Sequence, residues 1–303
     1  MKKRIRRKVF VRGAIQHVYQ RAKDKGVVFY DSLDRLMYFT TASVMAAKYE
    51  LTVLAVSIMF THLHQAIAIR GRREMEKYIQ DTSSVFARHY NRRYHRHGAL
   101  FKPNYGSASK VGAKRIRETL AYIYNNHVEK GLCDKAEESR WSFIPYFHSN
   151  HPFSEPIDYL KPGKRLMRSI KIVDKHRAAN MYLKYKDLNR IFCGLDDIET
   201  EQMIDYIIVK YMFIDFEAAI FFYNNYDDML RSFNATTGSE RDIPEEFIAV
   251  PDTYYEDILF LLKKSGFNLQ TVYNLTQERK GQIAKSLLIN SKARDHQIKK
   301  FLH

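Results

Sequence analysis

The stretch Phe60-Thr61-His62-Leu63-His64-Gln65 stands at the start of an apolar run. Successive side chains of an extended strand point to opposite faces, so His62 and His64 share one face and Leu63 points to the other. Two imidazoles side by side on a rigid strand can hold a divalent metal ion. The same pair could instead be two half-buried, hydrogen-bonded core histidines, and the motif alone does not separate these interpretations.

The composition is that of a globular protein with an unusual charge. The chain has 303 residues and a formal net charge of +16, which favours a polyanionic partner, nucleic acid rather than a membrane surface. A basic protein without such a partner has the same composition, so the charge alone does not decide. The two cysteines, Cys133 and Cys193, form neither a disulfide framework nor a Cys-rich zinc site.

We expect neither a signal peptide nor a membrane-spanning segment in this sequence. Its basic N-terminus is not followed by the apolar core of a signal peptide, because Arg12 and Gln16 interrupt it. The most apolar region, residues 212–223, carries Asp215 and Glu217 and is too short to span a bilayer. We therefore expect a cytoplasmic protein with no membrane partner.

The elements around the histidine motif predict an α+β fold. Residues 51–58 are almost continuously aliphatic and should form a strand covered on both faces, paired antiparallel with a strand at 62–69. The other elements expected before residue 130 are a half-buried strand at 14–21, a short strand within 99–112, and helices at 31–49, 73–95 and 113–129. This order suits a ferredoxin-like antiparallel sheet with packed helices and one further helix across the sheet.

The second half of the chain has a different character. Prolines between residues 145 and 162 are followed by a helical pattern from Leu166 onward, so we expect a domain of residues 1–154 and an all-helical domain of residues 155–303. Residues 276–303 read as two helices, the last of them basic. They could form a DNA-binding helix-turn-helix or a closing helical hairpin. The aromatic, partly acidic section 198–233 suits the core and self-association into a homodimer.

The helical segment 114–127 presents two tyrosines differently. Tyr124 falls on the apolar stripe with Ile116, Leu120 and Ile123, and should belong to the core. Tyr122 falls on roughly the opposite side, one turn before Asn126, so its phenol is expected to stand free of the core with an amide beside it. An ordinary surface tyrosine would have the same placement.

Several short pieces follow one another in a specific order and spacing between residues 12 and 147. They are His17-Val18-Tyr19-Gln20-Arg21, His62-Leu63-His64, Arg88-His89-Tyr90-Asn91-Arg92-Arg93, Gly98-Ala99-Leu100-Phe101, Tyr122-Ile123 to Asn126, Gly131-Leu132 and Trp141-Ser142. In this respect the chain resembles the single-tyrosine HUH (histidine–hydrophobic–histidine) transposases, in particular the REP-associated tyrosine transposases related to the smallest insertion sequences.

The resemblance implies an HUH endonuclease domain that cleaves and rejoins single-stranded, hairpin-containing DNA. Tyr122 would be the nucleophile and would form a 5′-phosphotyrosine intermediate. His62, His64 and Asn126 would hold Mg²⁺ or Mn²⁺. Mixed imidazole and amide ligation suits Mg²⁺ less well than carboxylates do, which keeps Mn²⁺ open as the metal.

Four positions depart from the family pattern, at Phe60, Thr61, Gln65 and His127. None of them removes a proposed ligand or the tyrosine, and Gln65 is the oddest because it points to the core side of its strand. These departures leave room for a catalytically inactive, domesticated DNA-binding protein of the same fold. An RNA-binding module is a third interpretation, since a ferredoxin-like sheet with basic and aromatic residues also suits RNA.

Basic residues with interleaved aromatics surround the motifs in sequence, which is the composition that single-stranded DNA requires. The predicted DNA-binding residues are Arg88, Arg92, Arg93, Arg96, Lys102, Lys110, Lys114 and Arg115. Tyr94 and Tyr105 are interleaved with them, whereas Tyr90 and Phe101 are expected in the core. His17 could reach the active site from the first strand or serve the core.

Overall fold

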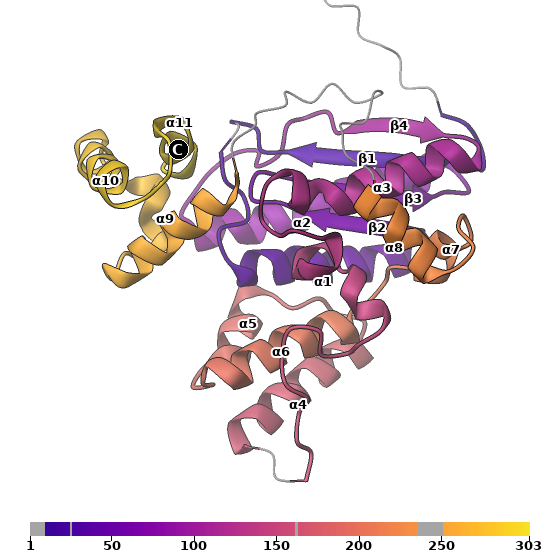
Figure 1. The fold of residues 1–303 in the computed structure, drawn as a ribbon. Coiled ribbons are helices and arrows are strands. Elements are labelled where there is room, and N and C mark those ends of the chain that lie inside the picture. Colours follow the sequence, from indigo (N-terminus) through magenta and orange to yellow (C-terminus); the bar gives the residue numbers. More distant parts are fainter. Residues whose placement is uncertain (1–9, 25, 161–162, 236–250) are drawn as a thin grey trace, which may run out of the picture.

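The computed structural model describes residues 10–24, 26–160, 163–235 and 251–303. Its first half is built on a four-stranded antiparallel sheet with the order β2-β3-β1-β4 (Figure 1). The elements of this half are β1 (Ile15–Arg21), α1 (Ser32–Lys48), β2 (Thr52–Ile58), β3 (His62–Ala68), α2 (Arg72–Arg93), β4 (Gly106–Lys110) and α3 (Ala113–Glu129). This is a ferredoxin-like arrangement with one added helix, so the predicted fold class is confirmed.

The strand register assigns each side chain of β3 to one of two faces. Antiparallel partners share a face, so His64 stands beside Tyr19 on β1 and Ser57 on β2. Helix α3 covers this face (Figure 1). Leu63 and Gln65 alternate to the opposite face, which packs on α1 and α2. The register of β3 therefore places the histidine pair on the face that α3 covers.

Strand β1 is more deeply buried than its alternating sequence indicates. The prediction was a half-buried strand, but five of its seven residues are buried. The cause is its central position between β3 and β4, with a helix on each face. Its two glutamines have partners inside the protein, since the Gln20 amide donates to Ser83 on α2 and the Gln16 amide donates to Ser109 on β4.

Gln65 has a clear role on the core face of β3. Its side chain is 1% exposed, its Nε2 donates to the Tyr38 hydroxyl on α1 at 2.8 Å, and its Oε1 accepts from the Tyr78 hydroxyl on α2 at 2.9 Å. A buried amide with both ends bonded avoids the cost of an unsatisfied polar group. The core-side orientation predicted for Gln65 is confirmed, and the residue ties both helices to the sheet.

An ionic cluster joins α1 to α2. The Arg93 guanidinium donates to the carboxylates of Asp31 and Asp34, and the hydroxyls of Tyr94 and Tyr185 donate to Asp34. Asp34 is fully buried, and burial together with the nearby Asp31 raises its pKa to about 6 although Arg93 opposes the rise. Tyr94 is thus a buried core residue, and the expectation that it stacks on an unpaired base of DNA is wrong.

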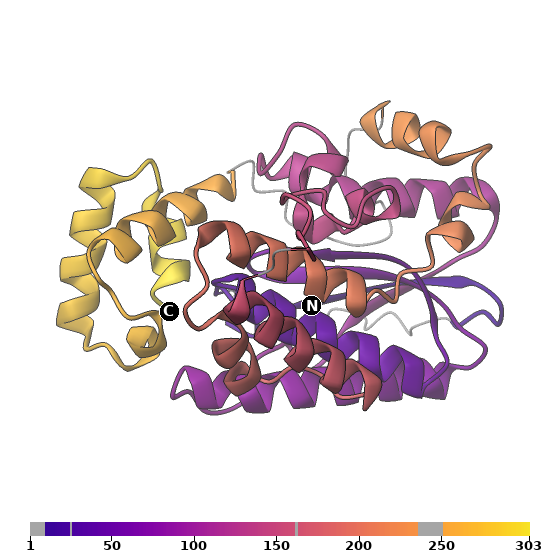
Figure 2. The ribbon, with the colours of Figure 1, turned by 90° about the horizontal axis from the view of Figure 1, so that it is seen from below.

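Beyond residue 130 the described residues form helices and turns. From Leu166 onward, where the sequence predicts a helical pattern, the described residues contribute no strand. The elements are η1 (Ala136–Glu138), η2 (Arg140–Ser142), η3 (Ile144–Phe147), α4 (Lys164–Ala178), α5 (Tyr185–Phe192), α6 (Asp197–Lys210), α7 (Phe216–Ile220), α8 (Tyr226–Ala235), α9 (Thr253–Lys264), η4 (Leu269–Asn274), α10 (Gln277–Asn290) and α11 (Asp295–Phe301). Helices α5 and α6 lie against α1, and α4 packs on α5 and α6. Helix α7 lies beside β2 and α8 lies on α3 (Figures 1 and 2). The domain boundary near residue 155 stays a prediction.

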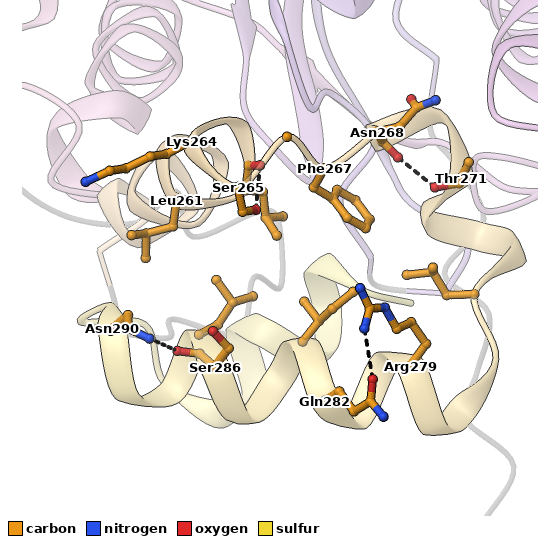
Figure 3. A pocket seen from close by; sticks show the side chains of 15 residues that line it. Leu261, Lys264, Ser265, Phe267, Asn268, Thr271, Arg279, Gln282, Ser286 and Asn290 are labelled. Carbon is orange, nitrogen blue, oxygen red and sulfur yellow. Dashed lines mark hydrogen bonds between the residues drawn. The ribbon is translucent and has the colours of Figure 1, made fainter.

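The last three helices gather at one end of the molecule (Figure 2). Helix α11 buries Gln297, Ile298 and Phe301, and the Tyr30 hydroxyl donates to the Phe301 carbonyl at 2.8 Å. Figure 3 shows a groove between α9 and α10, where the Arg279 guanidinium donates to Gln282. None of the residues that line this groove is a predicted site residue. The helix-turn-helix at residues 276–303 stays a prediction. One face of α11 is buried against the rest of the protein.

Across the described ranges, every helix is either too short or too polar to cross a bilayer.

Candidate active site

Four side chains from three elements converge on the α3 face of the sheet. His62 and His64 come from β3, His17 from β1 and Tyr122 from α3. The ring centroids of His62 and His64 are 5.0 Å apart, and the Tyr122 ring lies 5.4 Å from His64 and 5.6 Å from His17. The structure therefore brings the predicted histidine pair and the predicted nucleophile into one cluster.

Tyr122 is not free of the core, contrary to the prediction. Its side chain is 3% exposed. Helix α3 has the sheet on one side and α8 on the other, so both tyrosines of the helix are covered. Tyr124 stacks on Phe233 of α8 and donates its hydroxyl to the Leu54 carbonyl, as a core tyrosine should. Tyr122 instead points toward the histidines, which gives the two tyrosines different chemical surroundings.

Each histidine of the pair is oriented through its Nδ1 atom. His62 Nδ1 lies 2.9 Å from the Thr61 hydroxyl oxygen, and His64 Nδ1 lies 2.9 Å from His17 Nε2. A metal-ligating histidine commonly uses one ring nitrogen for the metal while the other is held by a neighbour. In this cluster a metal bond would be made by Nε2 of both rings. Thr61, which departs from the family pattern, supplies the neighbour of His62.

Asn126 lies one helical turn after Tyr122 and is also buried. Its Nδ2 donates to the Tyr122 carbonyl at 2.8 Å, so Oδ1 is the atom with which it could bind a metal. Among the described residues no group of three His, Cys, Asp or Glu side chains is placed to hold a metal ion. The predicted donor set of two imidazole nitrogens and one amide oxygen would suit a divalent ion such as Mn²⁺.

His127 is a residue of this region that the sequence analysis treated only as a departure from the family pattern. Its Nε2 lies 3.2 Å from the Ile58 carbonyl oxygen and its Nδ1 lies 3.3 Å from the Ser57 hydroxyl. A carbonyl can only accept, so Nε2 carries the proton and Nδ1 accepts from Ser57. Burial lowers the pKa of His127 to about 3, with smaller contributions from Arg35 and His62. The ring is neutral at pH 7 and fastens the end of α3 to β2.

Arg21 and Tyr19 were also missed as site residues. The residues His17, Tyr19 and Arg21 alternate along β1 and so share the face of the histidine pair, where Arg21 stands opposite His62 in the register. The Tyr19 ring stacks on His64 with centroids 5.9 Å apart. The period of two in the strand sequence was the available signal, and it marks Arg21 as the cation next to His62.

The predicted DNA-binding residues are scattered. Helix α2 lies on the sheet face opposite α3, so its exposed Arg88 and Arg92 are not brought together with Tyr122. Lys102 is exposed in the loop before β4, and Lys114 and Arg115 are exposed in the first turn of α3. These five cations stay predicted DNA contacts.

The other three predicted cations have internal positions. The Arg93 side chain is 10% exposed and is held by Asp31 and Asp34. Arg96 donates to Asn91 and to the Ala99 carbonyl. Lys110 is 2% exposed at the end of β4. We assign structural positions to all three, because phosphate contacts require a reachable cationic head group.

Residues 11–126 match the family described as "Transposase IS200 like". No curated protein matches the chain. A solved structure of a REP-associated tyrosine transposase bound to a REP hairpin is similar with a TM-score of 0.42 and 13% sequence identity, over 48% of this chain and 84% of that one. The matched family segment begins before β1 and ends at Asn126, so it contains the whole histidine–tyrosine cluster. The similarity to IS200-like transposases is thus confined to residues 11–126, the part of the chain that carries the cluster.

Proposed function

We propose that this protein is a metal-dependent transposase that cleaves and rejoins single-stranded or hairpin DNA through Tyr122. The observation that carries the proposal is that the ring centroids of Tyr122 and His64, the second histidine of the motif, are 5.4 Å apart. A core tyrosine such as Tyr124 has no such neighbour. His62, His64 and Asn126 would hold Mg²⁺ or Mn²⁺, and a homodimer stays a prediction.

The chemistry follows from the side chains of the cluster. The Tyr122 hydroxyl oxygen attacks the phosphorus and the bond from phosphorus to the 3′ oxygen breaks. The phenol loses its proton and the departing 3′ oxygen gains one, so the products are a 5′-phosphotyrosine and a free 3′-hydroxyl. A divalent ion, when bound, stabilises negative charge on the non-bridging oxygens of the phosphate. Arg21, on the same face as His62, would add positive charge at that phosphate.

The covalent link conserves the energy of the broken phosphodiester. A 3′-hydroxyl of another DNA end can therefore attack the phosphotyrosine and restore a phosphodiester without ATP. Because Tyr122 and both histidines are buried, the proposal requires the surroundings of Tyr122 to open locally when DNA binds. Opening of this kind is common for sites that exclude water during reaction.

The test is incubation of the protein with single-stranded hairpin DNA and Mn²⁺, followed by a denaturing gel that detects a covalent adduct. We expect an adduct with the wild type and with Tyr124→Phe, and none with Tyr122→Phe. An adduct that persists in Tyr122→Phe overturns the role of this residue. Tight DNA binding without any adduct supports the inactive DNA-binding protein, and preference for a ribose strand supports the RNA-binding module.

A further inference from the structure

The bond between His17 and His64 connects the first strand to the histidine motif. His17 Nε2 and His64 Nδ1 are 2.9 Å apart, and both side chains are fully buried. Two imidazole nitrogens form a hydrogen bond only if one of them carries the proton and the other accepts it. The pair therefore has two arrangements, which differ in the tautomer of His64.

Only one of these arrangements suits a metal ligand. If His64 donates from Nδ1, its Nε2 keeps a lone pair that can bind a metal. If His17 donates instead, neutral His64 carries its own proton on Nε2 and that atom cannot be a ligand. We propose that His17 accepts the Nδ1 proton of His64 and so holds it in the tautomer that binds metal. This inference rests on the proposed function and makes His17 a positioning residue.

The surroundings of His17 support a positioning role. Its ring also lies 5.6 Å from the Tyr122 ring and 6.4 Å from the Tyr19 ring, so it is packed between the other members of the cluster. The Thr61 hydroxyl has the corresponding position at His62 Nδ1. Both histidines of the motif are thus oriented at Nδ1, so Nε2 is the atom with which each would bind a metal ion.

The inference is tested by direct Mn²⁺ binding to the metal-free full chain, measured by calorimetry without DNA. We expect His17→Ala to weaken Mn²⁺ binding by about 10- to 100-fold, as loss of such partners commonly does. His17→Gln should bind within a few-fold of the wild type, because its amide oxygen can accept the Nδ1 proton. The matched control is Gln16→Ala, which removes the neighbouring buried side chain on the other face of β1 and should leave Mn²⁺ affinity unchanged.

Nitrogen NMR of labelled histidines gives a second readout, independent of metal. In the metal-free wild type, His64 should carry its proton on Nδ1, and His17→Ala should shift it toward the Nε2 tautomer. The inference is overturned if His17→Ala binds Mn²⁺ as the wild type does, or if Gln16→Ala weakens binding equally. His64→Ala distinguishes failure of this inference from failure of the proposed function. If His64→Ala also binds Mn²⁺ as the wild type does, the metal site of the proposed function is wrong as well.

Discussion

Gly106 on β4 lies directly against the ring of Tyr19 on β1. A Cβ atom at position 106 would fall 1.7 Å from Cε1 of that ring, far inside contact distance. The two residues are register partners, so the side chain of Tyr19 occupies the space that any other residue at 106 would need. Because the Tyr19 ring stacks on His64, this glycine is connected to the candidate site.

We therefore predict that Gly106→Ala displaces the Tyr19 ring and destabilises the protein by about 1–3 kcal/mol, the usual cost of overpacking. The adduct yield with hairpin DNA should also fall, since His64 loses its stacking partner. Urea unfolding of Gly106→Ala, Tyr19→Ala and the double variant measures the coupling between the two positions. If the free-energy changes of the two single variants add up to that of the double variant, the contact with Tyr19 is not what restricts position 106 to glycine.

Gln65 provides the second prediction. Replacement by Leu keeps the approximate volume but leaves the Tyr38 and Tyr78 hydroxyls without their partner inside the core. Each buried unsatisfied group costs about 1–3 kcal/mol, so Gln65→Leu should lower the free energy of unfolding substantially. The control is Gln65→Leu combined with Tyr38→Phe and Tyr78→Phe, which removes the orphaned hydroxyls and should recover most of the loss. If the triple variant shows no recovery of the free energy of unfolding in urea, the shape of the Gln65 side chain, rather than its hydrogen bonds, stabilises the core.

Arg92 and Arg93 are sequence neighbours with opposite surroundings, and the third prediction compares them. Arg93→Met leaves the buried Asp34 carboxylate without its cation and should cost about 3–5 kcal/mol of stability. Arg92→Met changes an exposed side chain and should alter stability by no more than about 0.5 kcal/mol. Thermal or urea unfolding at pH 7 provides the comparison.

For DNA affinity we expect the opposite order, with the larger effect in Arg92→Met and the smaller in Arg93→Met. If Arg92 contacts phosphate, Arg92→Met weakens binding to hairpin DNA and flattens its dependence on salt concentration. Arg93→Met should leave both unchanged at a temperature where the variant stays folded. Equal salt dependence for the wild type and Arg92→Met would remove Arg92 from the predicted DNA contacts.

The strands and helices of the first half could be predicted because their apolar periodicity is local. The antiparallel pairing at 51–69 and the helix at 113–129 needed no knowledge of distant residues. The burial of Tyr122 could not be predicted in this way, because a helical wheel shows one helix and not the strands β1 and β3, whose His17 and His64 lie against the Tyr122 ring.

The same limit applies to the charged and polar residues. Arg93 looked like a member of a basic run because Asp31 and Asp34 lie about sixty residues earlier in the sequence. The bond from His17 to His64 depends on the register of β1 against β3, which the sequence does not specify. The motif therefore predicts the residues of the candidate site, and the tertiary structure shows which of the surrounding cations are buried or paired with acids.

The last prediction concerns the pH dependence of stability. His127 has an ordinary pKa of 6.5 when exposed in the unfolded chain and a pKa of about 3 in the folded protein, because burial disfavours its charged form. Between these values the unfolded chain binds more protons, so the contribution of His127 to stability rises with pH. It is fully present above pH 6.5 and is lost as the pH falls toward 3.

The contribution of His127 is isolated by a variant, since Asp34 and Asp252 have pKa values raised to about 6 and act in the opposite direction between pH 4 and 6. We expect the difference in unfolding free energy between the wild type and His127→Asn to grow from pH 4 to pH 6.5 and then stay constant. Urea unfolding at half-unit steps measures it. A difference that is independent of pH would show that His127 is protonated, or reaches solvent, in the folded protein, so that burial does not keep its ring neutral.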